Sequence, residues 1–200
     1  MIALLDYGSG NLRSAERALA TTGSEVVITS DLDICLNADG LVVPGVGAFG
    51  SCLSGLRRVR GDYMIQERFE SDRPTLGICI GMQALFDVSD ESPEAQGVGI
   101  LTGRIERLTA PVVPHMGWNR VRPASAMSLF AGVEDEPFYF VHSYALKSVA
   151  EDSDSRVAMT DYAESFVAAI EYRSLSATQF HPEKSGDAGL QLLDNWVRTL

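Results

Sequence analysis

The sequence predicts an α/β fold with a mixed, mostly parallel central sheet, flanking helices and an antiparallel excursion. Short apolar runs alternate with helical stretches through the first half of the 200 residues, and this alternation is typical of a parallel sheet covered by helices on both faces. The second half instead contains strand-like runs separated by polar or Gly/Pro turns. Because 200 residues suit one domain and no long linker interrupts them, we expect residues 1–200 to form a single domain.

The elements of the first half follow one another at short intervals. An apolar run predicts a strand at 2–5, and leucine and alanine at helical spacing predict a helix at 11–20, which Gly23 ends. Further strands are predicted at 25–29, 41–43 and 75–78. Helices are predicted at 53–69, as one helix or two, and at 81–86.

The second half reads as strands followed by one closing helix. Strands are predicted at 100–108, 118–121, 138–141, 157–159, 166–172 and 176–180. The last two form a predicted hairpin that turns at Arg173-Ser174. Residues 190–197 place Leu190, Leu193 and Val197 on one face, which predicts a helix.

The net charge excludes one class of partner. Sixteen Lys and Arg against 27 Asp and Glu leave a formal charge of −11. Since nucleic-acid binding depends on clustered positive charge that releases counterions, we expect no nucleic-acid partner. Arg57, Arg58 and Arg60 form a small basic patch, which we interpret as a solvated helix face or loop.

The cysteines and the N-terminus indicate a cytoplasmic protein. Cys35, Cys52 and Cys79 show no CxxC spacing and no His at a zinc-finger interval, so we expect free thiols and no metal. The apolar run at the start stops at Asp6 and follows no basic segment, unlike a signal peptide. No apolar run approaches the roughly 20 residues that span a bilayer, so we expect no membrane association.

Cys79 is the candidate nucleophile. A predicted strand runs directly into it, a helical pattern follows, and Gly77 and Gly81 flank it. A nucleophile on a tight strand-to-helix turn requires small neighbours, and a helix N-terminus favours the reactive thiolate. A lone cysteine is more often a buried structural residue. The paired glycines at the end of a strand instead favour the interpretation of Cys79 as a nucleophile.

His181 is the candidate base. It follows the last predicted strand, and Glu183 lies two residues later, on the same side of an extended chain. A cysteine nucleophile requires a base, and the base requires an orienting group. His115 and His142 have no acidic residue two positions away, so a core or turn position is the better interpretation for both.

Residues 44–50 contain the pattern GxGxxG after a predicted strand. We reject a dinucleotide site, because that fingerprint opens the first strand–helix unit, and there the third glycine position holds Arg13. The open alternatives are a plain glycine-rich connection and a backbone loop that aims N–H groups at a developing oxyanion.

Together the three segments resemble the class I glutamine amidotransferases, a flavodoxin-like family. The shared features are the G-x-C-x-G turn around Cys79, the H-P-E sequence at 181–183 and the P-G oxyanion segment at 44–45, in the family's order. The resemblance extends over essentially the whole chain. Ile80 follows the nucleophile where leucine is expected, which keeps apolar bulk.

The resemblance implies a role for each matching residue. Cys79 would attack the side-chain amide of glutamine, His181 would transfer the proton and Glu183 would orient His181. Backbone N–H groups around Val46 and Gly47, together with that of Ile80, would bind the oxyanion. Residues 45–47 would either be preformed for this contact or turn over first. The expected contacts to the amino-acid end of glutamine are Gln83, Glu91 and the backbone of Ser143 and Tyr144.

Four segments resemble the histidine-biosynthesis branch of this family, namely 6–12, 114–119, 139–144 and 181–185. That branch passes ammonia to a (β/α)8-barrel cyclase, which makes imidazole glycerol phosphate and AICAR. The resemblance therefore implies a heterodimer without a cofactor, with Asn11, Trp118, Tyr139 and Lys184 at the interface. The alternatives are the glutaminase of another pathway, such as pyridoxal phosphate synthase, and a non-catalytic module of the same fold.

Overall fold

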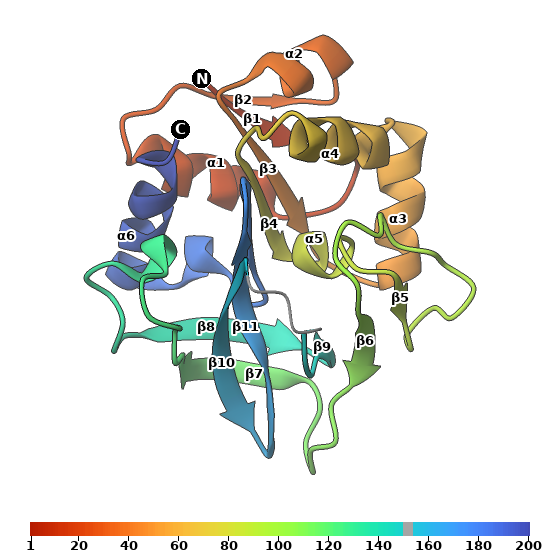
Figure 1. Cartoon of the computed structure of the whole chain (residues 1–200), viewed down its shortest axis with the longest axis vertical. Helices are drawn as coiled ribbons and strands as arrows, with labels where there is room; N and C mark the ends of the chain where they lie inside the picture. Colours follow the sequence, from red (N-terminus) through yellow and green to blue (C-terminus); the bar gives the residue numbers. More distant parts are fainter. Residues whose placement is uncertain (150–153) are drawn as a thin grey trace.

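A seven-stranded sheet forms the centre of the protein in a computed structural model, which describes residues 1–149 and 154–200. The strand order is β10-β11-β12-β4-β3-β1-β2 (Figure 1). The five strands from β12 to β2 are parallel, and β11 and β10 extend the sheet antiparallel. The strands are β1 (Ile2–Leu5), β2 (Val26–Thr29), β3 (Gly40–Gly45), β4 (Thr75–Cys79), β10 (Ser155–Tyr162), β11 (Glu164–Tyr172) and β12 (Leu175–Thr178). The predicted fold class and the β11–β12 hairpin are confirmed.

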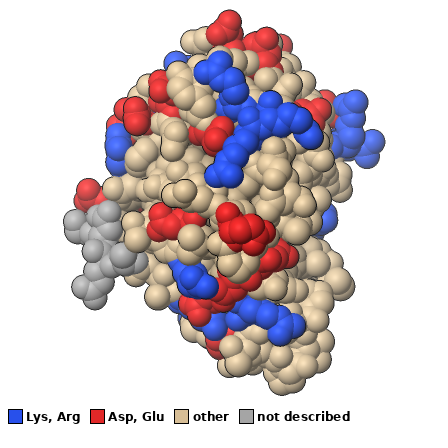
Figure 2. Space-filling view, turned by 90° about the vertical axis from the view of Figure 1, so that its right-hand side faces the viewer, with Lys and Arg blue, Asp and Glu red and all other residues tan. Residues whose placement is uncertain are grey.

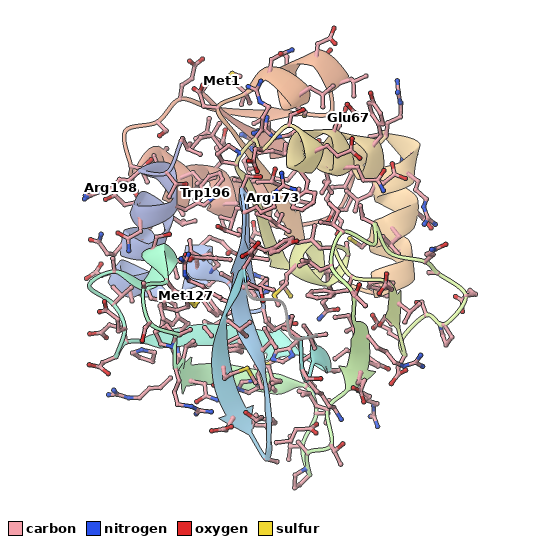
Figure 3. All side chains as sticks on the ribbon, viewed as in Figure 1. Met1, Glu67, Met127, Arg173, Trp196 and Arg198 are labelled. Atoms are coloured by element: carbon pink, nitrogen blue, oxygen red, sulfur yellow. The ribbon has the colours of Figure 1, made fainter. Side chains whose placement is uncertain are left out.

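Helices cover both faces of this sheet. They are α1 (Leu12–Ala20), α2 (Leu32–Asn37), α3 (Phe49–Arg58), α4 (Gly61–Glu70), α5 (Ile80–Gln83) and α6 (Gly186–Val197). In Figure 1, α1 and α6 lie on one side of the sheet and α3 and α4 on the other. Trp196 of α6 is buried and points inward (Figure 3), and its ring fills the space beside Gly40 at the start of β3.

The antiparallel excursion lies beyond the carboxyl ends of the parallel strands (Figure 1). It consists of a three-stranded sheet, β5-β6-β9, and a two-stranded sheet, β7-β8. The β6–β9 and β7–β8 pairs are antiparallel as predicted, whereas the short β5 pairs parallel to β6. Their bounds are β5 (Val88–Ser89), β6 (Arg104–Arg107), β7 (His115–Arg120), β8 (Pro137–His142) and β9 (Tyr144–Leu146). Ser143 joins β8 to β9 and so connects the two small sheets. A 3-10 turn, η1 (Ser128–Phe130), precedes β8, and a second, η2 (Pro182–Lys184), precedes α6.

Several predicted boundaries are wrong. The helical region predicted at 53–69 begins at Phe49 and is two helices, because Arg60 adopts a left-handed conformation with φ 61°. The helix predicted at 81–86 is the short α5, followed by tight turns through Phe86. The helix predicted at 190–197 begins earlier, at Gly186.

Strand boundaries in the excursion also differ. The strand predicted at 100–108 is shorter in the structure and corresponds to β6 alone. The N–H groups of Ile100 and Leu101 donate to the carbonyl of Leu85 and not to a neighbouring strand. β7 begins at His115, ahead of the predicted 118. The sequence patterns missed α2, β5 and β9, which are too short to carry a clear period.

The basic patch lies at a helix end, as expected. Arg57 and Arg58 close α3, Arg60 precedes α4 and all three are exposed. Figure 2 shows Lys and Arg side chains gathered on the side of the molecule where α3 and α4 lie, with Asp and Glu nearby. Arg57 lies 3.9 Å from Asp62, so part of the charge is neutralised. Within the described residues, no helix is both long and apolar enough to cross a membrane.

Candidate active site

Cys79 lies on a strained turn between β4 and α5. Its backbone has φ 56° and ψ −110°, which is rare for a residue other than glycine and is typical of functional sites. A Cβ on Gly81 would lie 1.9 Å from the carbonyl oxygen of Val43, and one on Gly77 would lie 2.9 Å from that of Gly81. Both glycines are therefore required for β3, β4 and α5 to approach one another around the thiol.

His181 and Glu183 form a buried pair. His181 Nδ1 lies 2.8 Å from Glu183 Oε1, and the two side chains are 2% and 5% exposed. The N–H of His181 donates to the carbonyl of Tyr139 at 2.9 Å, which fixes the backbone after β12. The other ring nitrogen, Nε2, is buried and has no hydrogen bond of ordinary geometry within the described part of the chain.

The pKa of His181 reflects opposing effects. Burial alone would lower it, but the interactions of the ring with Cys79 and Glu183 outweigh burial and raise the pKa to about 9. His181 is therefore protonated at neutral pH, with one nitrogen held by Glu183. Such an imidazolium can deliver a proton to a departing amine.

One cavity of about 380 Å³ brings most of the predicted site residues together. Its lining includes Cys79, His181, Val46, Gly47, Ile80, Gln83, Glu91, Ser143, Tyr144 and Lys184. Glu183 lies behind the ring of His181, bonded to Nδ1. The lining also includes Pro114, Val141 and His142, which sequence reasoning did not assign to the substrate site.

Two glutamines extend the site behind the nucleophile. Gln83 Nε2 donates to the carbonyl of Tyr144 at 2.9 Å and to Gln179 Oε1 at 2.8 Å. Gln179 Nε2 in turn lies 3.7 Å from Cys79 Sγ. Sequence reasoning missed Gln179, which directly follows the last residue of β12.

Glu91 contacts the start of a helix as well as the cavity. Its Oε2 accepts the N–H of Phe49, the first residue of α3, at 2.7 Å. A carboxylate is favourable at this end of a helix, where backbone N–H groups lack partners. Glu91 therefore connects the cavity with the segment that follows Gly47.

The N–H of Val46, an expected oxyanion donor, is engaged by Ser9. Ser9 Oγ accepts this N–H at 3.3 Å and donates to the carbonyl of the same residue at 2.7 Å. One hydroxyl thus holds both polar groups of Val46. Ser9 was not predicted as a site residue, although it belongs to the segment 6–12.

Of the four expected interface residues, Asn11, Trp118 and Lys184 are exposed and Tyr139 is half-buried. Trp118 is 56% exposed, which rules out a core position, and its ring lies 6.0 Å from that of Tyr139 in a T-shaped arrangement. Tyr139 also donates its N–H to Ser185 Oγ at 2.9 Å. Lys184 is exposed and lines the cavity. Exposed Asn11 caps α1, accepting the N–H of Ser14 at 3.3 Å, and α1 contacts η2.

Comparisons with known proteins agree with this architecture. The family model described as "Glutamine amidotransferase class-I" matches residues 3–200. The chain is 53% identical to "Imidazole glycerol phosphate synthase subunit HisH" of Corynebacterium efficiens, with 98% of this chain and 97% of that protein covered. It is 51% identical to the protein of the same name from Streptomyces coelicolor, with 100% of this chain and 93% of that protein covered.

Solved structures share the fold at low identity. A glutamine amidotransferase crystal structure superposes with a TM-score of 0.77 at 18% identity, covering 98% of both chains. PurLQS from Thermotoga maritima gives a TM-score of 0.71 at 18% identity, covering 99% of this chain and 97% of that one. With a family model that matches nearly its full length, the chain belongs to the class-I glutamine amidotransferase family.

Proposed function

We propose that the chain hydrolyses glutamine to glutamate and ammonia through Cys79, His181 and Glu183. We further propose that it passes the ammonia to the cyclase subunit of imidazole glycerol phosphate synthase, in cytoplasmic histidine biosynthesis. The relatives above support this reaction by name. The observation that carries the proposal is the strained Cys79 turn facing the buried His181–Glu183 pair in one cavity.

The first half-reaction forms a thioester. Before the reaction the proton of the Cys79 thiol rests on His181, and the sulfur attacks the side-chain amide carbon of glutamine. The carbon–nitrogen bond then breaks, and the imidazolium protonates the departing ammonia. The high pKa of His181, about 9, suits this step because the ring keeps its proton until the amine leaves.

The second half-reaction releases glutamate. Water enters after ammonia has left, His181 accepts one of its protons, and the oxygen attacks the γ-glutamyl thioester. The carbon–sulfur bond breaks, and Cys79 and His181 return to their starting state, with the proton on His181. Glu183 holds Nδ1 throughout, which leaves Nε2 free for both proton transfers.

Oxyanion stabilisation requires a change at Val46. Its N–H is held by Ser9, so it reaches a tetrahedral intermediate only after that bond breaks and residues 45–47 turn over. Gly47 supports this motion, because its φ of +93° lies in a region that glycine adopts without strain. The N–H of Ile80, the first residue of α5, is the second proposed donor.

The proposed contacts to the amino-acid end of glutamine all line the cavity. Glu91 supplies a carboxylate for the α-amino group, and Gln83 lies beside the backbone of Tyr144. Gln83 Oε1 is buried without a hydrogen-bonding partner among the described residues. That oxygen is available to a donor on the substrate.

The proposed partner is a (β/α)8-barrel cyclase, and together the two subunits form a heterodimer. Asn11, Trp118, Tyr139 and Lys184 supply its interface. An exposed aromatic beside a lysine is a common form of binding surface, in which the aromatic contributes apolar area and the lysine pairs with a carboxylate. Met116 and Trp118, 62% and 56% exposed, leave apolar area on β7 for a partner to cover.

Glutamate release tests the proposal. The protein is mixed with glutamine, the cyclase subunit and the cyclase ligand. We expect glutamate production by the unaltered chain and at least a 1,000-fold loss, on the order of a removed nucleophile, in Cys79→Ala. Cys35→Ala is the matched control, because Cys35 is a buried free thiol on α2, and it should retain activity. Full turnover by Cys79→Ala would refute the assignment.

The alternative partner, the synthase that makes pyridoxal phosphate, is not favoured by the relatives named above. Co-purification separates the two, because recovery of a different acceptor enzyme would overturn the histidine-pathway assignment and leave glutamine hydrolysis in place.

A further inference from the structure

We propose that His115 and His142 are positioning residues for glutamine, holding the backbone of Ser143 and Tyr144 in place beside the cavity. The inference rests on the proposed glutamine hydrolysis and adds two residues that the catalytic steps do not use. It concerns a histidine pair at the end of the β7–β8 hairpin.

The two imidazoles lie opposite each other across the hairpin. His115 pairs with His142 in the antiparallel register, and their side chains are buried. The ring of Tyr162 stacks on His115 at 4.1 Å, and that of Phe166 meets His142 edge-on at 4.9 Å. Burial lowers both pKa values, to about 4 for His115 and about 3 for His142, so both rings are neutral at physiological pH.

Their hydrogen bonds run in one direction. His142 Nδ1 lies 3.0 Å from the carbonyl oxygen of Tyr144, which only accepts, so Nδ1 carries the hydrogen. In a neutral ring, Nε2 of His142 is then an acceptor. His115 Nδ1, 3.1 Å from that nitrogen, must therefore donate. The chain of donors leads from His115 through His142 to the Tyr144 carbonyl.

The backbone carbonyls of Ser143 and Tyr144, at the wall of the cavity, both accept hydrogen bonds. The Tyr144 oxygen receives a second hydrogen bond from Gln83 Nε2 at 2.9 Å, which uses both of its lone pairs. The carbonyl of Ser143 accepts the N–H of Leu108 at 2.9 Å. Ser143 is also the residue where the chain passes from β8 to β9. The backbone at 143–144 is thus held in a fixed orientation at the junction between β8 and β9.

The same chain connects the cavity with the exposed face of the hairpin. Met116 follows His115 directly, and Trp118 lies two residues further, both exposed. Displacement of β7 by a docked partner would change the His115–His142 distance and so the support of the wall. The pair therefore makes glutamine affinity depend on the position of the hairpin.

Two amide substitutions at one position test the proposal in the complex with the cyclase subunit. An asparagine amide can replace Nδ1 of histidine, whereas a glutamine amide reaches the place of Nε2. His142→Asn should keep the bond to Tyr144 and a KM for glutamine within about threefold, and His142→Gln should raise KM about tenfold with kcat nearly unchanged. At position 115, which is one hydrogen bond further from the cavity, the KM for glutamine should likewise be lower in His115→Asn than in His115→Gln.

A second readout separates positioning from general damage. Alkylation of Cys79 by iodoacetamide requires no glutamine site, and its rate should be equal in all four variants. Equal KM values for His142→Asn and His142→Gln would overturn the proposal, as would a loss confined to kcat with slower alkylation. If His142→Gln does not fold, the variants His115→Asn and His115→Gln provide the test, and equal KM values for these two would overturn the proposal. Absence of glutamate release by the unaltered complex would instead refute the proposed function.

Discussion

Glu183 determines how His181 responds to pH. It is bonded to Nδ1 at 2.8 Å and, with Cys79, keeps the pKa of the imidazole at about 9 despite burial. Protonation of the leaving ammonia requires the imidazolium, so kcat/KM should fall as pH rises through this pKa. The carboxylate therefore widens the pH range of activity toward the basic side.

Glu183→Gln should move that basic limb to lower pH. The amide keeps the shape of the side chain but removes the negative charge that favours the imidazolium, so the pKa of His181 falls toward its ordinary value. The measurement is kcat/KM for glutamine in the complex between about pH 6 and 10. Glu94→Gln, an exposed carboxylate in the loop after β5, is the control. If kcat/KM of Glu183→Gln fell at the same or a higher pH than in the unaltered chain, Glu183 would not be the group that raises the pKa of His181.

Local motifs predicted the proposed triad, but not the residues that contact it or Val46. The turn at Cys79 and the pair His181 and Glu183 are visible because each lies within a few neighbouring residues. Ser9 and Gln179 were not predicted, because their partners, Val46 and Cys79, lie 37 and 100 residues away in the chain. Only the packing of β1, β3, β4 and β12 side by side brings these groups together.

At the scale of elements, Ser9 connects two loops that follow neighbouring parallel strands. It lies after β1, and its hydroxyl holds both backbone groups of Val46 after β3. This bond stabilises the conformation in which Val46 cannot donate to an oxyanion. Its loss should favour the turned-over segment.

Ser9→Ala should raise glutamate release by the chain without its partner about threefold to tenfold, the range expected for losing a modest hydrogen bond. Steady-state release of glutamate by the isolated subunit is the measurement. Ser54→Ala is the matched control, because that hydroxyl donates to the carbonyl of Gly50 within α3 and not to Val46. Unchanged or reduced release in Ser9→Ala would show that this bond does not restrain the segment.

Long, periodic elements were predicted better than short ones. The strands of the parallel sheet were found because buried strands form continuous apolar runs. α2 was missed at six residues, although Asp31 caps it by accepting the N–H of Ile34 at 2.9 Å. The excursion was predicted as strands without their pairing, since β8 and β9 join different sheets through Ser143.

At the scale of the whole molecule, the expected interface and the catalytic cavity lie at the same end. Both lie beyond the carboxyl ends of the parallel strands, where open α/β sheets place their sites. Lys184 is one of the expected interface residues, and it also lines the cavity and carries an exposed positive charge. On a chain of net charge −11, such a charge is a distinctive contact for an acidic partner group.

Lys184→Glu should weaken binding of the cyclase subunit at least about tenfold at low salt, and less at high salt, because exposed charges are screened. Calorimetric titration of the two subunits measures the effect. Arg173→Glu is the control, an equal change of charge at the β11–β12 turn. This turn lies beside the first residue of β4, whereas Cys79 is the last residue of that strand. Equal affinities for the two variants would place the interface elsewhere.

Covalent trapping tests the central claim most directly. The complex with the cyclase subunit is incubated with diazo-oxo-norleucine, a glutamine analogue that alkylates a catalytic thiol, and the modified residue is identified by peptide mass spectrometry. The account predicts one adduct on Cys79, none on the buried thiols of Cys35 and Cys52, and none in Cys79→Ala. An unmodified Cys79 in the active complex, or an adduct on either other cysteine, would contradict it.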